Sequence, residues 1–319
     1  MSGMGKAAIL FSGQGSQYSE MGLDLYEKDP LFKKSLDRIN SEIGSFDLLE
    51  VLADKNQQLE QTMYQQPAIV ALGLGLNALV KRDLPELPLG GIVGLSLGEY
   101  AALITADALS EKDGIKALEA RARFMQEDAE NSQSKMAALL KPNIAAVEQI
   151  CCKLAESGQI IAVSNYNSPK QVVIGGQADA VSQAIAQIID TKAAKKAIGL
   201  PVSGAFHTKL FANASDKMAP ILNEITFSEP SVPVISNTTG QPFTKESIPL
   251  TLVKQIVSPT HFADCISYLF DNEDVDTTIE LGPGGTLTQF VKQVDRKVKR
   301  YQVEDHDTYQ AFLEEIRGN

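Results

Sequence analysis

Residues 94–98, Gly-Leu-Ser-Leu-Gly, place one hydroxyl group, that of Ser96, between two glycines. The apolar stretch 90–94 predicts a short buried strand, and residues 99–109 are rich in helix formers. On a strand-to-helix turn the glycines permit a strained backbone, and the serine hydroxyl stands above the sheet beside a helix N-terminus, which favours developing negative charge. This pattern favours a serine nucleophile over a simple turn residue.

A serine nucleophile needs a base, and the sequence offers three histidines. His306 lies in a charged C-terminal stretch that is typical of a surface. His261 follows a Pro-Thr pair at an expected helix start, where capping or packing is its expected role. His207 lies in the apolar segment 200–211, where an unpartnered imidazole would be unfavourable. We therefore predict that His207 is the base, with a satisfied core histidine as the alternative interpretation.

An arginine on a predicted helix at 110–129 is the third candidate, and the spacing of Ser110 and Asp113 predicts a capped start for that helix. Arg123 has glutamates at its i−4 and i+4 positions, so its charge is matched locally. Arg121 has apolar helical neighbours and no carboxylate of its own on the helix. Such a guanidinium can bind a substrate carboxylate in a bidentate manner or form a structural ion pair with a distant acidic residue. The residues alone leave both interpretations open.

The elements that must position these side chains follow an α/β rhythm. Apolar strands at 7–11 and 90–94 are each followed by a helical pattern, which predicts a parallel sheet with helices on both faces. Between residues 131 and 203 the order becomes strand, helix, strand, strand, helix, strand, which is ferredoxin-like. We therefore predict a large domain from residues 1–130 and 204–319, with 131–203 as a smaller inserted subdomain. Within that insert the strands are expected at 135–140, 160–167, 171–176 and 195–201, and the helices at 144–157 and 178–190.

Composition excludes several classes of function. The chain has 319 residues, of which 44% are hydrophobic, and its net charge of -11 argues against broad nucleic-acid binding. The longest mainly apolar run, 68–80, is well short of the roughly 20 residues that a membrane span needs. Three cysteines, of which Cys151 and Cys152 are adjacent, predict neither a disulfide framework nor a metal site. A cytoplasmic location is expected.

Two basic clusters stand out against this acidic background. Each can be a solvated surface or a local binding patch for an acidic partner. The first cluster consists of Lys192, Lys195 and Lys196, and the second of Lys292, Arg296, Lys297, Lys299 and Arg300.

Eight separated motifs resemble, in the same order, those of the malonyl-CoA:acyl carrier protein transacylases, an acyltransferase family of fatty acid biosynthesis. They are FSGQGSQ at 11–17, QQPA at 65–68, GLSLGEY at 94–100, RARFMQ at 121–126, NYNSPKQVVIGG at 165–176, SGAFHT at 203–208, KQIVSP at 254–259 and ELGPGGTL at 280–287. The resemblance covers essentially the whole chain. It implies an α/β-hydrolase-like large domain with a ferredoxin-like insert, in agreement with the rhythm described above.

The resemblance also implies roles for the residues at matching positions. Ser96 matches the acylated nucleophile, His207 its base and Arg121 the residue that pairs with the free malonyl carboxylate. The main-chain N–H groups of Gln14 and Leu97 match the oxyanion hole. The remaining matches are Gln255, whose carbonyl would orient the histidine in place of a triad carboxylate, Gln66 and Asn165 near the acyl pocket, and Phe206, an aromatic residue of the kind that would exclude a 2-methyl branch.

This sequence departs from the family pattern at a few positions. Histidine is usual in the family where this chain has Leu95, and any polar help from that neighbour is absent here. Proline is usual at Ser12 and common at Ala205, and glycine is usual at Ala122. These changes affect loop stiffness and packing, and none removes a residue with an implied chemical role.

The implied activity is a ping-pong transfer of a malonyl group from malonyl-CoA to Ser96, and then to the phosphopantetheine thiol of an acyl carrier protein. Because the substrates bring the phosphopantetheine, we expect no cofactor and no metal. We further expect a monomer without nucleic-acid or membrane partners. Two alternatives stay open. A serine thioesterase or esterase would need a triad carboxylate between Ser96 and His207 in the chain, and a family member could be non-catalytic.

Overall fold

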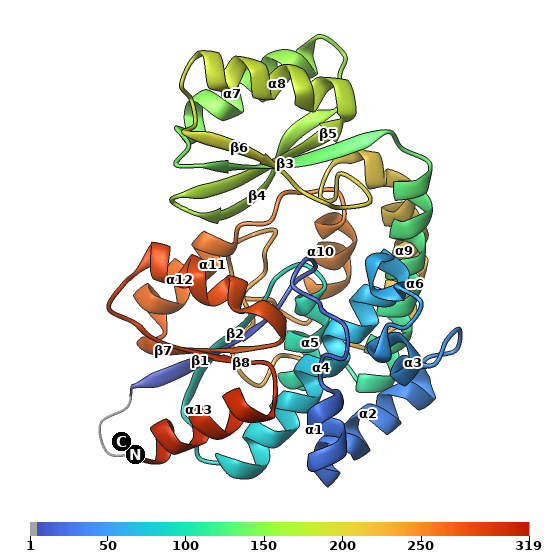
Figure 1. Cartoon of the computed structure of the whole chain (residues 1–319), viewed down its shortest axis with the longest axis vertical. Coiled ribbons are helices and arrows are strands. Elements are labelled where there is room, and N and C mark those ends of the chain that lie inside the picture. Colours follow the sequence, from blue (N-terminus) through green and yellow to red (C-terminus); the bar gives the residue numbers. More distant parts are fainter. Residues whose placement is uncertain (1–4, 319) are drawn as a thin grey trace.

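A parallel sheet forms the centre of the larger part of the molecule. The structure is a computed structural model that describes residues 5–318. Neighbouring strands in the order β2-β1-β7-β8 are all parallel, and a separate antiparallel sheet lies above them in Figure 1. The predicted α/β class with a parallel sheet is therefore confirmed. The parallel strands are β1 (Lys6–Phe11), β2 (Leu89–Gly94), β7 (Val275–Leu281) and β8 (Lys299–Val303).

Helices cover both faces of this sheet. In β1, Ile9 and Phe11 pack with α4 and α5 on one face, whereas Ala8 and Leu10 pack with α11 and α12 on the other. A strand that is buried on both faces must be apolar at successive positions, which the sequence of β1 satisfies. The α-helices of this part are α1 (Leu23–Lys28), α2 (Pro30–Glu42), α3 (Leu48–Ala53), α4 (Thr62–Asp83), α5 (Gly98–Thr105), α6 (Glu111–Glu130), α9 (Ala212–Glu224), α10 (Ile248–Gln255), α11 (Phe262–Asn272), α12 (Thr286–Val294) and α13 (His306–Gly318). Short 3-10 turns lie at η1 (Gln58–Glu60), η2 (Lys209–Phe211) and η3 (Pro283–Gly285).

The apolar run 68–80 forms most of α4, a core helix that is buried nearly all round. Its two glycines are sites of close approach, because a Cβ atom at Gly73 would lie 2.9 Å from Phe11 Cδ1 and one at Gly75 would lie 2.6 Å from Phe32 Cε2. Over residues 5–318, no helix is both long enough and apolar enough to cross a membrane. The apolar character of α4 is thus explained by its position inside the protein.

The antiparallel sheet has the strand order β4-β5-β3-β6. Its elements run strand, helix, strand, strand, helix, strand along the chain, the order that the sequence predicts, although the last strand is shorter than expected. The face toward α7 and α8 is apolar and includes Leu139, Val172 and Ile174. The elements are β3 (Ser134–Leu140), α7 (Ile144–Glu156), β4 (Ile161–Ser168), β5 (Gln171–Gln177), α8 (Ala178–Asp190) and β6 (Lys196–Gly199).

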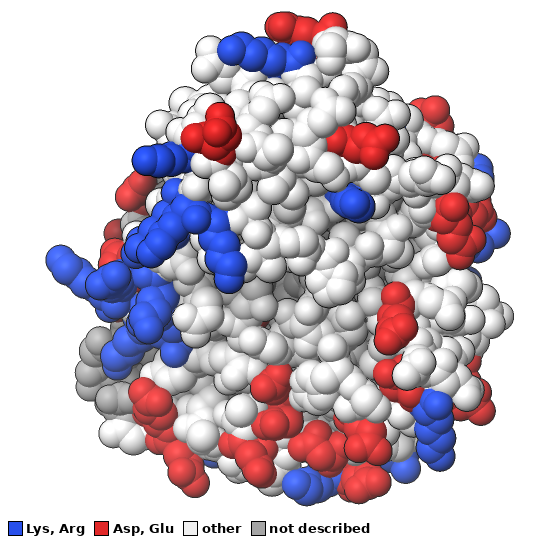
Figure 2. Space-filling model, turned by 45° about the horizontal axis from the view of Figure 1, so that its top comes forward, with Lys and Arg blue, Asp and Glu red and all other residues white. Residues whose placement is uncertain are grey.

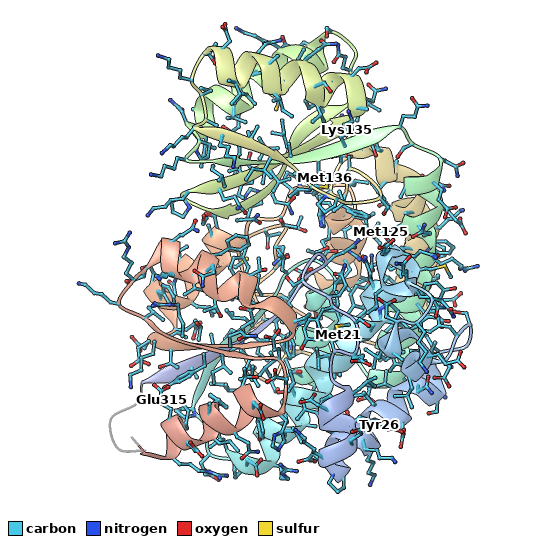
Figure 3. The ribbon with its side chains drawn as sticks, viewed as in Figure 1. Met21, Tyr26, Met125, Lys135, Met136 and Glu315 are labelled. Atoms are coloured by element: carbon cyan, nitrogen blue, oxygen red, sulfur yellow. The ribbon has the colours of Figure 1, made fainter. Side chains whose placement is uncertain are left out.

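The opposite face of the small sheet packs on the larger part. Met136 of β3 and Met125 of α6 belong to one core cluster, and Figure 3 shows both at this junction. At the sheet edge, β4 pairs in parallel with Thr260, through the Tyr166 N–H to the Thr260 carbonyl at 2.7 Å and the Thr260 N–H to the Ser164 carbonyl at 3.0 Å. The small sheet is therefore fixed to the segment that leads from α10 to α11.

Candidate active site

Ser96 lies on a tight turn between β2 and α5. Its φ of 54° is in the left-handed region that residues other than glycine rarely adopt. A Cβ atom at Gly94 would lie 2.0 Å from the Gly98 carbonyl carbon, and one at Gly98 would lie 2.6 Å from the Phe11 carbonyl oxygen. The two glycines therefore let the turn close on itself and pack against the end of β1, which is the arrangement expected of a nucleophile turn.

His207 lies within hydrogen-bond distance of Ser96, with 2.9 Å between Nε2 and the serine Oγ. Its Nδ1 lies 2.9 Å from the main-chain carbonyl oxygen of Gln255. Because a carbonyl oxygen can only accept, Nδ1 carries the proton and Nε2 is free to accept one from the serine. Burial lowers the pKa of His207 to about 4; the Gln255 carbonyl opposes this shift and the Arg121 charge adds to it. The imidazole is therefore neutral near pH 7, as a general base must be.

The main-chain N–H groups of Leu97 and Gln14 have no hydrogen-bond partner within residues 5–318. Leu97 is the N-cap residue of α5, so its N–H is one of the free donors that every helix start leaves. Gln14 lies in the loop after β1, and this loop contacts the serine turn, because a Cβ atom at Gly13 would lie 3.1 Å from Leu95 Cγ. Free N–H donors at a helix N-terminus are suited to hold a negatively charged oxygen.

Arg121 is fully buried beside Ser96. Its Nη1 donates to Gln66 Oε1 at 2.5 Å, and its Nη2 donates to Gln255 Oε1 at 2.8 Å and to Ser96 Oγ at 3.1 Å. Its Nε has no partner among the described residues, and no carboxylate in residues 5–318 lies within ion-pair distance of it. Burial lowers the pKa of this guanidinium, whereas Tyr100 and Glu99 oppose the shift. The direct structural ion pair, the alternative left open by the sequence, is therefore not formed.

Two buried residues that the sequence analysis did not single out complete the site. Asn237 Oδ1 accepts from the Ser96 N–H at 2.7 Å, and Glu99 accepts from the Asn237 N–H and from Gln255 Nε2, each at 2.5 Å. Burial raises the pKa of Glu99 to about 8, and the two hydrogen bonds and the Arg121 charge oppose the rise. A signal for Glu99 was present in the sequence, since it is the one charged residue in the helix Gly98–Thr105. No local pattern marks Asn237.

The remaining predicted residues lie at different distances from this centre. The buried Phe206 directly precedes the base and packs on Phe211, with 5.0 Å between ring centroids. Asn165 donates to Thr260 Oγ1 at 2.8 Å and accepts from Ser164, and none of its hydrogen bonds to described residues reaches Ser96, His207 or Arg121. The structure thus places Asn165 at the junction of the two sheets, and its role at the acyl pocket stays a prediction.

The two other histidines lie outside this centre. His261 is the N-cap residue of α11, as expected, and its ring stacks on Tyr166 at 4.7 Å between centroids. His306 begins α13, where its Nδ1 lies 3.3 Å from Asp307. Within residues 5–318, no cluster of three or more histidine, cysteine or acidic side chains could hold a metal ion.

A serine with a neutral histidine, free N–H donors and a buried guanidinium is the equipment of an enzyme that transfers acyl groups through a serine ester. Residues 9–310 match the family described as "Acyl transferase domain". The malonyl CoA-acyl carrier protein transacylase of Bacillus subtilis (strain 168) is 34% identical over 98% of both chains, and that of Staphylococcus aureus (strain MRSA252) is 32% identical over 99% of this chain and 98% of its own. The chain belongs to the malonyl CoA-acyl carrier protein transacylase family.

Solved structures agree in fold over nearly the whole chain. The MCAT crystal structure from Streptococcus pneumoniae has a TM-score of 0.91 at 36% identity and covers 97% of this chain and 100% of its own. A malonyl-transacylase in complex with its type II PKS acyl-carrier protein has a TM-score of 0.90 at 29% identity and covers 97% and 99% of the two chains. The likeness therefore extends over both sheets.

Proposed function

We propose that this protein transfers malonyl groups from malonyl-CoA to the phosphopantetheine thiol of an acyl carrier protein, as a step of fatty acid biosynthesis. The observation that carries the proposal is the buried Arg121 guanidinium, which lies 3.1 Å from Ser96 Oγ and has no carboxylate partner among the described residues. A carboxylate at the far end of a short acyl group would supply that partner. The names of the curated relatives and the carrier-protein complex support the same donor and acceptor.

In the first half-reaction Ser96 Oγ attacks the thioester carbonyl carbon while His207 Nε2 takes the hydroxyl proton. The main-chain N–H groups of Leu97 and Gln14 hold the resulting oxyanion, each contributing about 3 kcal/mol in the transition state. The C–S bond then breaks, and the imidazolium returns the proton to the departing CoA thiolate. The Gln255 carbonyl, which accepts from Nδ1, stabilises the imidazolium while it exists.

In the second half-reaction the phosphopantetheine thiol of the carrier protein replaces CoA. His207 takes the thiol proton, the thiolate attacks the malonyl ester carbon, and the Ser96 oxygen leaves with that proton. The thioester is thereby rebuilt on the carrier, and the enzyme returns to its starting state. Every step uses side chains and main-chain groups of this chain, and we propose that no cofactor or metal takes part.

Selectivity follows from the charge and shape of the acyl pocket. An acetyl group would leave Arg121 buried without its anionic partner, and a site with an unpaired buried charge discriminates strongly. Phe206 and Gln66 are proposed to limit the remaining space, so that a 2-methyl branch is disfavoured. Malonyl should therefore be preferred over both acetyl and methylmalonyl.

The test replaces Arg121 with Ala and compares acylation of Ser96 by malonyl-CoA and by acetyl-CoA. We expect the malonyl rate to fall about 10- to 100-fold, the effect of losing one charge-assisted hydrogen bond, with the preference over acetyl abolished. Arg123→Ala is the matched control, because that arginine is exposed on the same helix and lies over the Phe124 ring. An unchanged preference in Arg121→Ala would remove Arg121 from the proposal.

The basic clusters are proposed to dock the carrier protein, which brings an acidic surface. In the view of Figure 2, Lys and Arg side chains gather on the left side of the molecule. Main-chain hydrogen bonds from Lys195 to Leu140 and from Lys141 to Lys170 bring basic residues together at one end of the small sheet, and Ser168 at the β4–β5 turn bonds Gln293 of α12. These contacts support one continuous basic surface that spans the small sheet and α12.

One member of the predicted second cluster is reassigned. Arg300 donates to the main-chain carbonyls of Asp295, Arg296 and Val298, so its guanidinium holds the turn before β8. Exposed Lys292 and Lys297 are better docking residues. We expect their replacement by Glu to raise the KM for the carrier about tenfold and to leave the KM for malonyl-CoA unchanged. Equal effects on both constants would exclude this surface, and Lys116→Glu, on the exposed face of α6, is the control.

A serine hydrolase is the principal alternative, because it would use the same serine, base and oxyanion donors. The partner of His207 Nδ1 is a main-chain carbonyl, and the base makes no hydrogen bond with a carboxylate in residues 5–318. Incubation of the enzyme with malonyl-CoA and a pantetheine-bearing carrier, followed by mass measurement of the carrier, decides between them. Free malonate without malonylated carrier would favour the hydrolase. A family member without catalysis would give no malonyl adduct on the enzyme.

The finer architectural and cellular predictions complete the proposal. We infer that residues 131–203 form a ferredoxin-like subdomain, supported by the β4-β5-β3-β6 order, within an α/β-hydrolase-like domain of residues 1–130 and 204–319. Three cysteines without disulfides support a cytoplasmic location. A monomer without nucleic-acid or membrane partners remains our proposal.

A further inference from the structure

Glu99 is fully buried at the start of α5, directly beneath the serine turn. A carboxylate in the first turn of a helix usually accepts from N–H groups of that same turn. Glu99 does not: its two oxygens accept from the Asn237 main-chain N–H and from Gln255 Nε2, residues that lie 138 and 156 positions away in the chain. Burial of a carboxylate is unfavourable unless such partners are supplied, so these long-range contacts need an explanation.

The two partners of Glu99 hold both main-chain groups of the nucleophile. Asn237 Oδ1 accepts from the Ser96 N–H at 2.7 Å, and its Nδ2 donates to the Gly94 carbonyl at 2.9 Å. Gln255 Nε2, which donates to Glu99, also donates to the Ser96 carbonyl at 3.0 Å. Since Ser96 is held at a φ of 54°, these bonds fix a strained residue on its N–H side and its carbonyl side at once.

Gln255 connects Glu99 to the rest of the catalytic group. Its main-chain carbonyl holds His207 Nδ1, and its side-chain oxygen accepts from Arg121 Nη2. The amide can make these bonds in one orientation only, with the oxygen toward Arg121 and the nitrogen toward Glu99. In the reversed orientation the amide nitrogen, a donor, would face the guanidinium, which is also a donor. Glu99, Arg121 and the Ser96 carbonyl therefore together fix which way the Gln255 amide points.

The same chain of bonds places the Glu99 carboxyl near Arg121 without an ion pair. Glu99 reaches the guanidinium through the Gln255 amide, so when Glu99 ionises, as the pH rises through about 8, the buried cation gains a counter-charge one residue away. A direct bidentate pair would occupy the edge of the guanidinium that a substrate carboxylate must use. The inserted amide oxygen takes one hydrogen bond from Nη2, and Nε is left without a partner among the described residues.

We propose that Glu99 is a positioning residue of the acyl transfer site, which orients Ser96 through Asn237 and Gln255 and sets the orientation of the Gln255 amide against Arg121. The assignment rests on the proposed function only in the name of the substrate. Its physical content is that Ser96 becomes a poorer nucleophile toward any acyl donor when the carboxylate is lost.

The test measures the acylation of Ser96 in Glu99→Gln at pH 9, where Glu99 is ionised, with two donors, malonyl-CoA and p-nitrophenyl acetate. The second donor has no carboxylate, so it reports on Ser96 without Arg121. We expect both acylation rate constants to fall about 10- to 100-fold, the effect of a small misplacement of reacting groups, with the KM for malonyl-CoA within threefold of the parent. Glu99→Asp, which keeps the charge, should recover part of the rate. A parental rate of Glu99→Gln with p-nitrophenyl acetate would overturn the assignment.

A matched control comes from another buried carboxylate with the same kinds of donor. Asp128 accepts from the Ala214 main-chain N–H at 2.8 Å and from Asn213 Nδ2 at 2.9 Å, and it makes no bond to Ser96. Asp128→Asn should lower the melting temperature and leave the rate per folded molecule near the parental value. A loss of rate in Asp128→Asn that matches Glu99→Gln would show that any buried carboxylate has this effect and would overturn the specific role.

The pH dependence of the acylation rate distinguishes a positioning role of Glu99 from a purely structural one, because a purely structural role would leave this dependence unchanged. Glu99 has an elevated pKa, and the charge that acts on it is that of Arg121, which stays protonated. Glu99 in turn acts on Tyr100 and Cys265, whose pKa values burial raises further from neutrality. The rate ratio of parent to Glu99→Gln should therefore increase as the pH rises through about 8 and Glu99 ionises. A constant ratio from pH 6 to 9 would contradict the proposal. If the parent enzyme malonylates no carrier, the proposed function fails, while the comparison with p-nitrophenyl acetate still tests Glu99.

Discussion

The two sheets of this chain differ in whether polar side chains are buried beside them. At the turn after β2, Glu99, Arg121 and Gln255 are fully buried and are bonded to one another or to Ser96. In the small sheet, the face toward α7 and α8 consists of apolar side chains, and Tyr166 and Glu148 meet near the surface. A buried polar group needs its partners in place, whereas an apolar face needs only volume and shape.

This difference separates the two quantities that a mutation can change. A substitution at the serine turn disturbs a few directional contacts, so we expect a large change in rate and a modest change in stability. A substitution in the small sheet removes apolar contacts, so we expect a change in the free energy of unfolding with little change in rate per folded molecule. Four measurements test this difference.

The largest effect is expected for Ser96→Ala, which removes the nucleophile and leaves the turn in place. Transfer of malonyl to the carrier should fall at least about 10⁴-fold, because the covalent route is lost while binding and the oxyanion donors remain. Intact-mass analysis after exposure to malonyl-CoA should find no adduct. Ser231→Ala is the control, since that hydroxyl bonds the Ala106 carbonyl at the C-terminal end of α5, the end opposite to Ser96. An adduct of unchanged yield on Ser96→Ala would place the chemistry elsewhere.

The pH dependence of Ser96 acylation ranks second and isolates the base. Burial lowers the pKa of His207 to about 4 and raises that of Glu99 to about 8, so the two groups titrate in different ranges. In Glu99→Gln the base is the remaining group, and its neutral, active form persists down to its pKa. The rate constant should therefore stay level from pH 8 to pH 5. A histidine with an ordinary pKa of about 6.5 would lose about 30-fold over that range, and such a loss would contradict the assignment.

The third measurement turns to the small sheet. Leu139 is fully buried between β3 and the helices α7 and α8, and Leu139→Ala would leave a cavity there. We expect a loss of about 2–5 kcal/mol in the free energy of unfolding, with an unchanged acylation rate per folded molecule. Thermal unfolding and p-nitrophenyl acetate kinetics on the same sample measure both quantities. A reduced rate at unchanged stability would show that the small sheet shapes the site directly.

The contrast also explains what the sequence could and could not predict. The strands at 7–11 and 90–94, those of the insert, the serine turn and the helix cap at Ser110, which accepts from the Asp113 N–H, follow from local spacing and were predicted. The strands β7 and β8 were not predicted. His207 was a candidate because few histidines exist, and Arg121 because its own helix offers it no carboxylate. The partners of Arg121 could not be read in this way, since Gln66 and Gln255 come from helices far apart in the chain.

The same limit applies to the residues that were missed or reassigned. The contacts of Glu99 and Asn237 depend on how α5 meets the loop after residue 234, which no local pattern encodes. Arg300 belongs to a basic cluster in the sequence, but in the structure its guanidinium bonds the main chain of the turn before β8. Local chemistry identifies which groups can react, and tertiary structure decides which of them are held in place.

The smallest effect is expected for Tyr166→Phe, at the junction of the two sheets. The change removes a hydrogen bond of 2.6 Å from the phenol to Glu148 and keeps the ring that stacks on His261. Because this contact lies near the surface, we expect a loss of at most about 1 kcal/mol in the free energy of unfolding and a rate within twofold of the parent. Tyr166→Ala, which also removes the stacked ring, should lower stability further. If Tyr166→Phe instead slowed acylation severalfold, β4 would transmit its position through Thr260 to the segment that carries Gln255, and the small sheet would share in positioning the base.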